Sequence, residues 1–231
     1  MIQIAYTDEH EQLLFGIPLF RDLPMNIKHT LSDKLDYNIY QLEKHDIIAR
    51  QNTICKHLHV LLKGKLRVDI IDACGNEVLI EYIVAPRAFA TPHLFQADPT
   101  LPATFTVINE GVLLKATKSS LFDLISEEPG LLKRFLSITG NCNKCTVVRL
   151  RALSYKNIRS RFISYLFEQK RCREENEFEI EHNQVQLADY LCVTRPALSK
   201  EINKMIKEGL LEMKGRKVLL LQQEKLKKML L

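Results

Sequence analysis

The chain has 231 residues, with 33 lysine and arginine residues against 28 aspartate and glutamate residues and a formal net charge of +5. Hydrophobic residues make up 46% of it and charged residues 26%, which is typical of a globular protein and excludes an intrinsically disordered one. No apolar run approaches the roughly 18–20 residues of a membrane span, and no secretory signal begins the chain. Because six cysteines without such a signal do not indicate a disulfide framework, we expect a cytoplasmic protein with no membrane partner.

The excess of positive charge lies entirely in the last fifth of the chain. Residues 184–231 hold ten lysine and arginine residues against five acidic ones, and the charges of the preceding residues cancel. Such an asymmetry indicates a separate module that faces a polyanion, although a basic tail without that role would give the same count.

Short β-rich runs dominate the first half of the chain after one helix. Residues 19–36 have the spacing of a short amphipathic helix entered through a proline turn. From about residue 38 to residue 118, apolar runs alternate with turn signals roughly every ten residues, which predicts an antiparallel β-roll, sandwich or barrel. The runs are Ile47-Ile48, His59–Leu62, Leu66–Ile71, Val78–Val84, Thr104–Ile108 and Val112–Ala116, and the turn signals include Lys63-Gly64 and Asn109–Gly111.

A helical spacing begins after residue 118. We expect a short helix around Leu121–Ile125 and a long one from Pro129 to about Leu150. Along the long helix, apolar or small residues recur in alternating steps of four and three, as in a coiled-coil seam. We therefore predict a homodimer through this helix; the alternative is a helix that packs on its own domain. The seam residues are Leu131, Phe135, Ile138, Cys142 and Cys145.

Residues 183–221 carry the most informative motif. Asn183 is predicted to cap a short helix that runs through Leu191, and Thr194 to cap a second helix that ends at Gly209. A basic hairpin follows, with strands at Leu210–Met213 and Val218–Leu221. Two helices joined by a tight turn and followed by such a hairpin predict a winged helix-turn-helix.

In such a motif the second helix enters the DNA major groove with its N-terminal residues on base edges. Arginine can bond to guanine through two atoms, and lysines on the hairpin neutralise phosphates. The alternative is a helical hairpin that serves only as core. The residues predicted to contact DNA are Thr194, Arg195, Pro196, Ser199, Lys200, Asn203, Lys214, Arg216 and Lys217.

The stretch Leu187–Glu201 resembles the helix-turn-helix signature of the Crp/Fnr family of bacterial transcription regulators. The resemblance implies an α+β fold with a β-roll effector domain over residues 1–128, a dimerisation helix over 129–153 and a winged helix-turn-helix over 154–231. It also implies contacts to bases and phosphates by Arg195, Ser199 and Lys200. Family members often have glutamate where this chain has Pro196, so its preferred half-site should differ from theirs.

The function implied is that of a homodimeric, sequence-specific regulator that binds double-stranded DNA, works with RNA polymerase and is not an enzyme. In members that bind cyclic nucleotides, a Gly-Glu pair holds the ribose and an arginine the cyclic phosphate. Here Ala90 and Thr91 replace the pair and Leu101 stands near the arginine position, so we expect cyclic AMP not to bind. Arg87 leaves another small-molecule effector open. The expected effector pocket comprises Arg87, Phe89, Ala90, Thr91, His93, Leu101, Ala103 and Thr104.

A weaker resemblance links the chain to the branch that regulates hybrid-cluster-protein genes under nitrosative stress. It rests on the stretches Phe89–Phe95 and Leu153–Arg159 and implies a haem or nitric-oxide sensor, with His93 as a candidate haem ligand. The iron–sulfur branch needs a cysteine cluster near the N-terminus, whereas the first cysteine here is Cys55. A third reading is a regulator that binds DNA without any ligand.

Cys55, His57 and His59 alternate along one strand, like half of a cupin metal motif. No glutamate follows at the spacing that such a motif needs, so we expect exposed polar residues at a strand edge and no metal. The rival class, a cupin-like enzyme, therefore lacks a complete ligand set. It also leaves the C-terminal motif unexplained.

Overall fold

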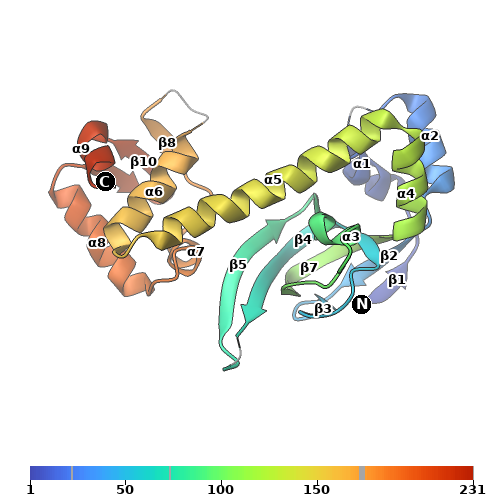
Figure 1. Cartoon of the computed structure of the whole chain (residues 1–231), viewed down its shortest axis with the longest axis horizontal. Helices are drawn as coiled ribbons and strands as arrows, with labels where there is room; N and C mark the ends of the chain where they lie inside the picture. Colours follow the sequence, from blue (N-terminus) through green and yellow to red (C-terminus); the bar gives the residue numbers. More distant parts are fainter. Residues whose placement is uncertain (22, 73, 172–174, 231) are drawn as a thin grey trace. The chain divides into compact units, whose positions relative to one another are not determined.

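The computed structural model describes residues 1–21, 23–72, 74–171 and 175–230 (Figure 1). Within these, the side chains of residues 26, 29, 30, 32, 142–146, 148, 149 and 151 are not described. The chain forms two compact units, residues 1–143 and 144–231, and each has its own hydrophobic core. The boundary between the two units falls inside the long helix α5 (Pro129–Ser154).

The first unit is built on one antiparallel sheet of seven strands. The strand order is β1-β2-β7-β4-β5, and β3 pairs with β7 while β6 pairs with β4. The strands are β1 (Ile2–Ile4), β2 (Tyr37–Leu42), β3 (Ile47–Ala49), β4 (His57–Ile71), β5 (Glu77–Val84), β6 (Arg87–Phe89) and β7 (Thr104–Thr117). This sheet, with the helices and the helix-turn-helix that follow, confirms the predicted α+β class.

Two of the predicted turns are wrong, because β4 runs on through Lys63-Gly64 and β7 through residues 109–111. The register between the two strands shifts several times where these segments face each other. Gly64 has a φ of 97°, and a Cβ on Gly111 would lie 2.2 Å from the carbonyl oxygen of Lys63. The glycines therefore mark β-bulges at which two long strands approach closely.

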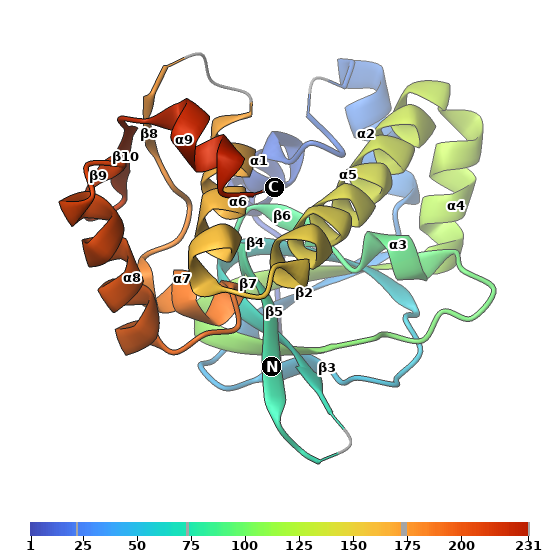
Figure 2. The same cartoon turned by 60° about the vertical axis from the view of Figure 1, so that its left-hand side comes forward.

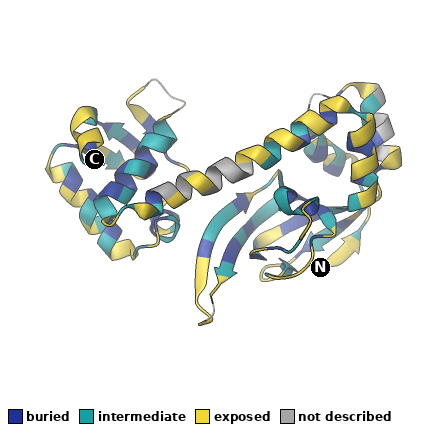
Figure 3. Ribbon diagram, in the orientation of Figure 1, coloured by how far each residue is buried: buried dark blue, intermediate teal, exposed yellow. Residues whose placement is uncertain are grey.

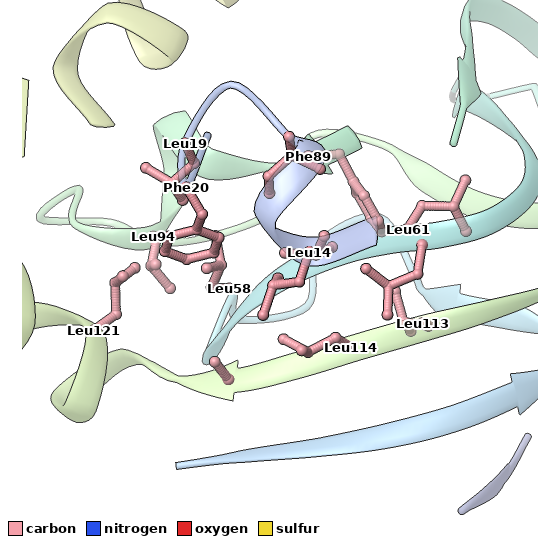
Figure 4. Packing of buried hydrophobic residues seen from close by; sticks show 14 of the residues in the cluster. Leu14, Leu19, Phe20, Leu58, Leu61, Phe89, Leu94, Leu113, Leu114 and Leu121 are labelled. Carbon is pink, nitrogen blue, oxygen red and sulfur yellow. The ribbon is translucent and has the colours of Figure 1, made fainter. Parts of the chain in front are cut away.

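Four short helices and the start of α5 accompany the sheet. They are α1 (Asp8–Gly16), α2 (Met25–Lys34), α3 (Thr91–Leu94) and α4 (Lys118–Glu127). Figure 4 shows Leu14 of α1 and Phe20 lying near Leu58 of β4 and Leu114 of β7 in the core. Burial of these side chains joins the N-terminal segment to the sheet. No helix in the described part of the chain is long and apolar enough to cross a membrane.

The second unit is a helical domain with a small sheet. Its elements are α6 (Ile158–Lys170), β8 (Glu177–Glu179), α7 (Gln184–Tyr190), α8 (Arg195–Lys207), β9 (Leu211–Lys214), β10 (Lys217–Leu220) and α9 (Gln223–Lys228). The sheet has the order β8-β10-β9, so β9 and β10 form the predicted hairpin. Phe162 of α6, Leu187 of α7 and Leu198 of α8 meet in the core with Val218 of β10.

Candidate nucleic-acid interface and ligand pocket

Both helices of the helix-turn-helix begin at a capping residue. The side chain of Asn183 accepts a hydrogen bond from the Gln186 N–H at 3.0 Å, and the side-chain oxygen of Gln186 accepts one from the Asn183 N–H at 3.1 Å. Thr194 Oγ1 accepts from the Ala197 N–H at 3.4 Å. Between the helices, Cys192 takes a φ of 53°, which makes the connection a tight turn (Figure 2). These features confirm both predicted caps.

Helix α8 has buried residues on one side and exposed residues elsewhere (Figure 3). Leu198, Ile202 and Met205 are buried in the core of the second unit. The steps between them, of four and three residues, leave the opposite face of the helix to solvent. On that face Pro196, Lys200 and Asn203 are exposed and Ser199 is half-buried, whereas Thr194 and Arg195 are exposed at the N-terminal end of the helix. The helical part of the predicted DNA-contact set is therefore exposed on that face and at that end.

The hairpin β9–β10 carries the remaining predicted DNA contacts at its tip. Lys214 and Lys217 pair across the turn, Gly215 opens the turn with a φ of 62°, and all four tip residues are exposed. Arg216 forms an ion pair with Glu179 of β8 at 2.5 Å, in which both side chains are half exposed. An ion pair in water contributes little stability, so a phosphate can replace this carboxylate at small cost.

Several of the predicted cations have no carboxylate partner. Among the residues that the structure describes, Arg195, Lys200, Lys214 and Lys217 make no ion pair. Their charge therefore remains available to a polyanion, in contrast to that of Arg216.

Sequence reasoning missed an arginine that holds the recognition helix. Arg159, near the start of α6, donates from Nε to Glu201 of α8 at 2.5 Å and from both terminal nitrogens to Glu208 at 2.8 and 2.9 Å. These contacts raise the pKa of Arg159, chiefly through the bonds to Glu208, and lower the pKa of the Glu208 carboxyl. The arginine thus ties α6 to α8 and neutralises two carboxylates there.

The signal for this contact in the sequence was weak. Glu201 and Glu208 stand seven residues apart on the predicted recognition helix, so they lie on one side of it. Nothing in that spacing identifies which basic residue, 42 positions earlier in the case of the Glu201 bond, would meet them.

In the first unit, residues 87–104 correspond to the segment that holds the nucleotide in members that bind cyclic nucleotides, and we call this segment the cassette. None of its described side chains offers an unpaired cation to a phosphate. Ala90 has a φ of 56°, a left-handed conformation that favours glycine. Thr91 and Leu101 are buried. Arg87 donates from Nη1 to Glu81 at 2.9 Å, so its charge is already paired.

The other predicted effector residues are dispersed. Phe89 and Ala103 lie in the core, and His93 Nδ1 lies 3.1 Å from the side-chain oxygen of Gln96. Thr104 lines a cavity of about 360 Å³ together with residues of β4, β5 and β7. The eight residues therefore do not surround one cavity in the described structure.

A cavity of about 410 Å³, which we call the basic cavity, lies beside β3 and the first residues of β4. Its basic lining residues are Arg50, Lys56, His57, His59 and Lys115, and its apolar ones are Ile47, Ile48, Ala49, Ile54 and Leu101, with Thr53 completing the wall. Leu101 is the one predicted effector residue among them. The sequence signal was present in the Cys55–His59 alternation, which we interpreted as a strand edge.

That interpretation is wrong, because β4 lies between β7 and β6 rather than at an edge. Cys55 and His59 are buried, and the His59 ring stacks on Phe89 with a centroid distance of 5.3 Å. Burial raises the pKa of the Cys55 thiol and lowers the pKa of His59 to about 3. Across the described residues, no three His, Cys, Asp or Glu side chains are grouped to hold a metal ion.

Helix α5 presents a different apolar face from the one predicted as the dimer seam. Leu131 and Phe135 are 1% and 5% exposed because they pack into the core of their own unit, and Ile138 packs against that core. Leu131 and Phe135 thus have almost no area left for a second copy, and we correct their assignment to the seam. The spacing identified an apolar face but not the partner that covers it. The side chains of Cys142 and Cys145 lie outside the described residues.

The exposed apolar residues of α5 form a second stripe. Among the described side chains of this helix they are Leu132 and Leu136 in the first unit and Val147 and Leu150 in the second, of which the last three are at least 60% exposed. The steps between them are 4, 11 and 3 residues, each of which returns close to the same side of a helix.

Two models of protein families match the chain. Residues 40–128 match a cyclic nucleotide-binding domain, and residues 160–229 match a Crp-like helix-turn-helix domain. No curated protein matches the sequence.

Several solved structures share the fold. A mutant of CooA from Carboxydothermus hydrogenoformans has a TM-score of 0.67 at 18% identity, covering 94% of this chain and 100% of that one. FixK2 from Bradyrhizobium japonicum has a TM-score of 0.60 at 15% identity over 83% and 96%. The catabolite activator protein of Thermus thermophilus has a TM-score of 0.52 at 18% identity over 92% and 98%. At these identities the likeness concerns the fold.

Proposed function

The chain belongs to the Crp/Fnr family of DNA-binding transcription regulators, which are not enzymes, and on that premise we propose that it reads a pseudo-palindromic DNA site as a homodimer. The main support for this proposal is that Arg195 is exposed at the N-terminal end of α8 and has no ionic partner among the described residues. Arg195 reads a base edge, and Lys200 and the hairpin tip contact phosphates. The protein acts in the cytoplasm together with RNA polymerase.

The dimer forms through α5. The stripe of Leu132, Leu136, Val147 and Leu150 supports this part of the proposal, because exposed apolar residues at helical spacing are typical of a helix–helix interface. Two copies of the stripe would remove these side chains from water, and two recognition helices would then meet successive major grooves.

The signal is a small molecule other than cyclic AMP. The ion pair of Arg87 with Glu81 and the buried Leu101 support this, since a cyclic phosphate in the cassette would have no cation there. Such an effector would shift the population of binding-competent dimers. A haem-based signal finds no support in the described residues, where His93 is not among those that line the basic cavity.

The test is a matched pair of substitutions in the full chain, measured on its selected DNA site and on single-base variants of that site. Arg195→Ala should abolish the preference at one base pair of each half-site, a loss of about tenfold to a hundredfold in discrimination. Lys217→Ala should weaken binding to all sites alike and reduce its salt dependence. The reverse pattern, with base preference lost in Lys217→Ala alone, would contradict the proposal.

A further inference from the structure

One buried histidine in the first unit lacks the hydrogen bond that its position demands. His59 is 4% exposed, and its Nδ1 has no hydrogen-bond partner among the residues that the structure describes. Buried polar atoms in proteins almost always have such a partner, and an exception calls for an explanation in terms of a water, an ion or a ligand. His59 is one of the residues that line the basic cavity.

The charges around the cavity all have the same sign. In the described part of the chain, Arg50, Lys56 and Lys115 form no ion pair, and no acidic side chain is among the residues that line the cavity. Lys115 packs over the ring of Tyr40 at 5.4 Å, and burial lowers its pKa. A concave site with uncompensated positive charge attracts an anion.

The rest of the wall is apolar. Ile47, Ile54 and Leu101 face the same space as the basic side chains, and the volume of about 410 Å³ lies within the range of small-molecule sites. Polar groups on one side and aliphatic ones on the other suit a ligand with an anionic head and an apolar body.

We propose that the basic cavity binds a small organic anion, a carboxylate or phosphate ester with an aliphatic body. The anionic head lies among Arg50, Lys56 and Lys115, beside His59. This site is separate from the cassette residues Arg87–Thr91. Its role as the effector site rests on the proposed function, whereas the binding itself does not.

The position of the cavity suits such a role. Lys115 lies on β7, which ends at Thr117 and leads directly into α4 and then α5. A ligand that fixes Lys115 therefore acts on the strand that precedes the proposed dimerisation helix.

Three probes of equal chain length separate charge from apolar contact: hexanoate, hexyl phosphate and hexanol. Each is titrated into the full chain by calorimetry, and the imidazole nitrogens of His59 are followed by NMR. Lys115→Gln removes one charge from the cavity. Lys65→Gln is the matched control, because Lys65 also packs over a tyrosine, Tyr82, and burial also lowers its pKa, but it does not line the cavity.

At least one anion should bind and shift the His59 nitrogen signals, and hexanol should bind more weakly. Lys115→Gln should weaken the anion roughly tenfold, as expected for loss of one charge-assisted bond, and Lys65→Gln should leave it unchanged. Absence of binding by both anions, equal binding of hexanol, or equal effects of the two substitutions would each overturn the inference. DNA affinity is measured separately, so a chain that binds the anion but no DNA contradicts the proposed function alone.

Discussion

His59 shows how one buried side chain couples this protein's stability to pH. The pKa of its imidazole is lowered from 6.5 to about 3, mainly because burial disfavours the charged ring and secondarily because of Lys115 and His57. Between these two pH values the unfolded chain binds a proton that the folded chain does not. Stability therefore falls as the pH falls through this window.

We predict that replacing this histidine flattens the acid side of the stability profile. The wild type should lose up to about 4 kcal/mol of unfolding free energy between pH 6.5 and pH 3 that a His59→Leu variant does not lose. Urea unfolding of both chains across this range measures the difference. Parallel curves would show that His59 is not buried in its neutral form.

Substitution of a glycine at the bulges tests how closely β4 and β7 approach each other. Gly111→Ala should destabilise the chain by about 3 kcal/mol or more, because the added Cβ would meet backbone atoms of Lys63 and Gly64. Gly130→Ala, in the exposed first turn of α5 with nothing within 4 Å of the new Cβ, should not destabilise it and should stabilise it by up to about 1 kcal/mol. Thermal unfolding of the pair checks this, and equal melting temperatures would contradict the close approach of the two strands.

Among the elements, α8 depends on α6 for its position and charge. Arg159 compensates Glu201 and Glu208, which would otherwise put two negative charges on the helix that approaches DNA. We predict that Arg159→Gln lowers DNA affinity about tenfold, and more so at low salt, because the freed carboxylates repel phosphates.

Arg171→Gln is the control for that substitution. Arg171 follows α6, is exposed and pairs with Glu168 at 3.7 Å, and it forms no ion pair with α8 among the described residues. Fluorescence anisotropy with a labelled DNA duplex measures both variants. If they bind DNA equally well, the contact of Arg159 with α8 does not position the recognition helix.

Some helices and strands could be predicted from the sequence, and others could not. The two helices of the helix-turn-helix were predictable to within a residue or two, since their caps are local hydrogen bonds between near neighbours such as Thr194 and Ala197. The bulges at Gly64 and Gly111 were mistaken for turns, because a glycine permits both and the choice depends on the facing strand. Helix α1 and strand β2 were missed, since α1 is short and its apolar residues cluster instead of recurring at a helical interval.

The candidate sites divide in the same way. The polar face of α8 follows from helical periodicity. The basic cavity depends instead on contacts between residues that are far apart in the sequence, such as His59 and Lys115. Which side of α5 would be buried by its own unit was equally beyond the sequence pattern. Both the predicted seam and the exposed stripe have helical spacing. Leu131 differs from Leu132 only in that Leu131 is buried in the core of its own unit, which the spacing does not indicate.

For the whole molecule, the exposed stripe on α5 predicts how two copies associate. Leu136→Asp should convert the dimer to a monomer, since a carboxylate in an apolar interface loses its hydration without gaining a partner. Met25→Asp is the control, because Met25 is similarly exposed at the start of α2, where an acidic residue is favourable. Sedimentation velocity distinguishes the two, and a dimer that persists in Leu136→Asp would contradict the stripe as its interface.

The distribution of charge along the chain predicts how DNA binding depends on salt. The net charge of +5 lies in residues 184–231, which form the helix-turn-helix, the hairpin and α9, whereas the charges of the preceding residues cancel. A dimer places two such segments on one DNA duplex. Its affinity for DNA should fall with rising salt, because the release of counterions from the DNA is less favourable at a higher salt concentration. We therefore propose that the charge directs where DNA binds and that the exposed residues of α8 determine which sequence is bound.

Selection of bound sequences from a random DNA library by the full chain measures whether the protein reads DNA as a symmetric dimer. We predict enrichment of an inverted repeat whose half-site centres lie about one helical turn, roughly 10 base pairs, apart. Enrichment of no sequence, or of a single site without repeat symmetry, would contradict a dimer that reads DNA through two copies of α8.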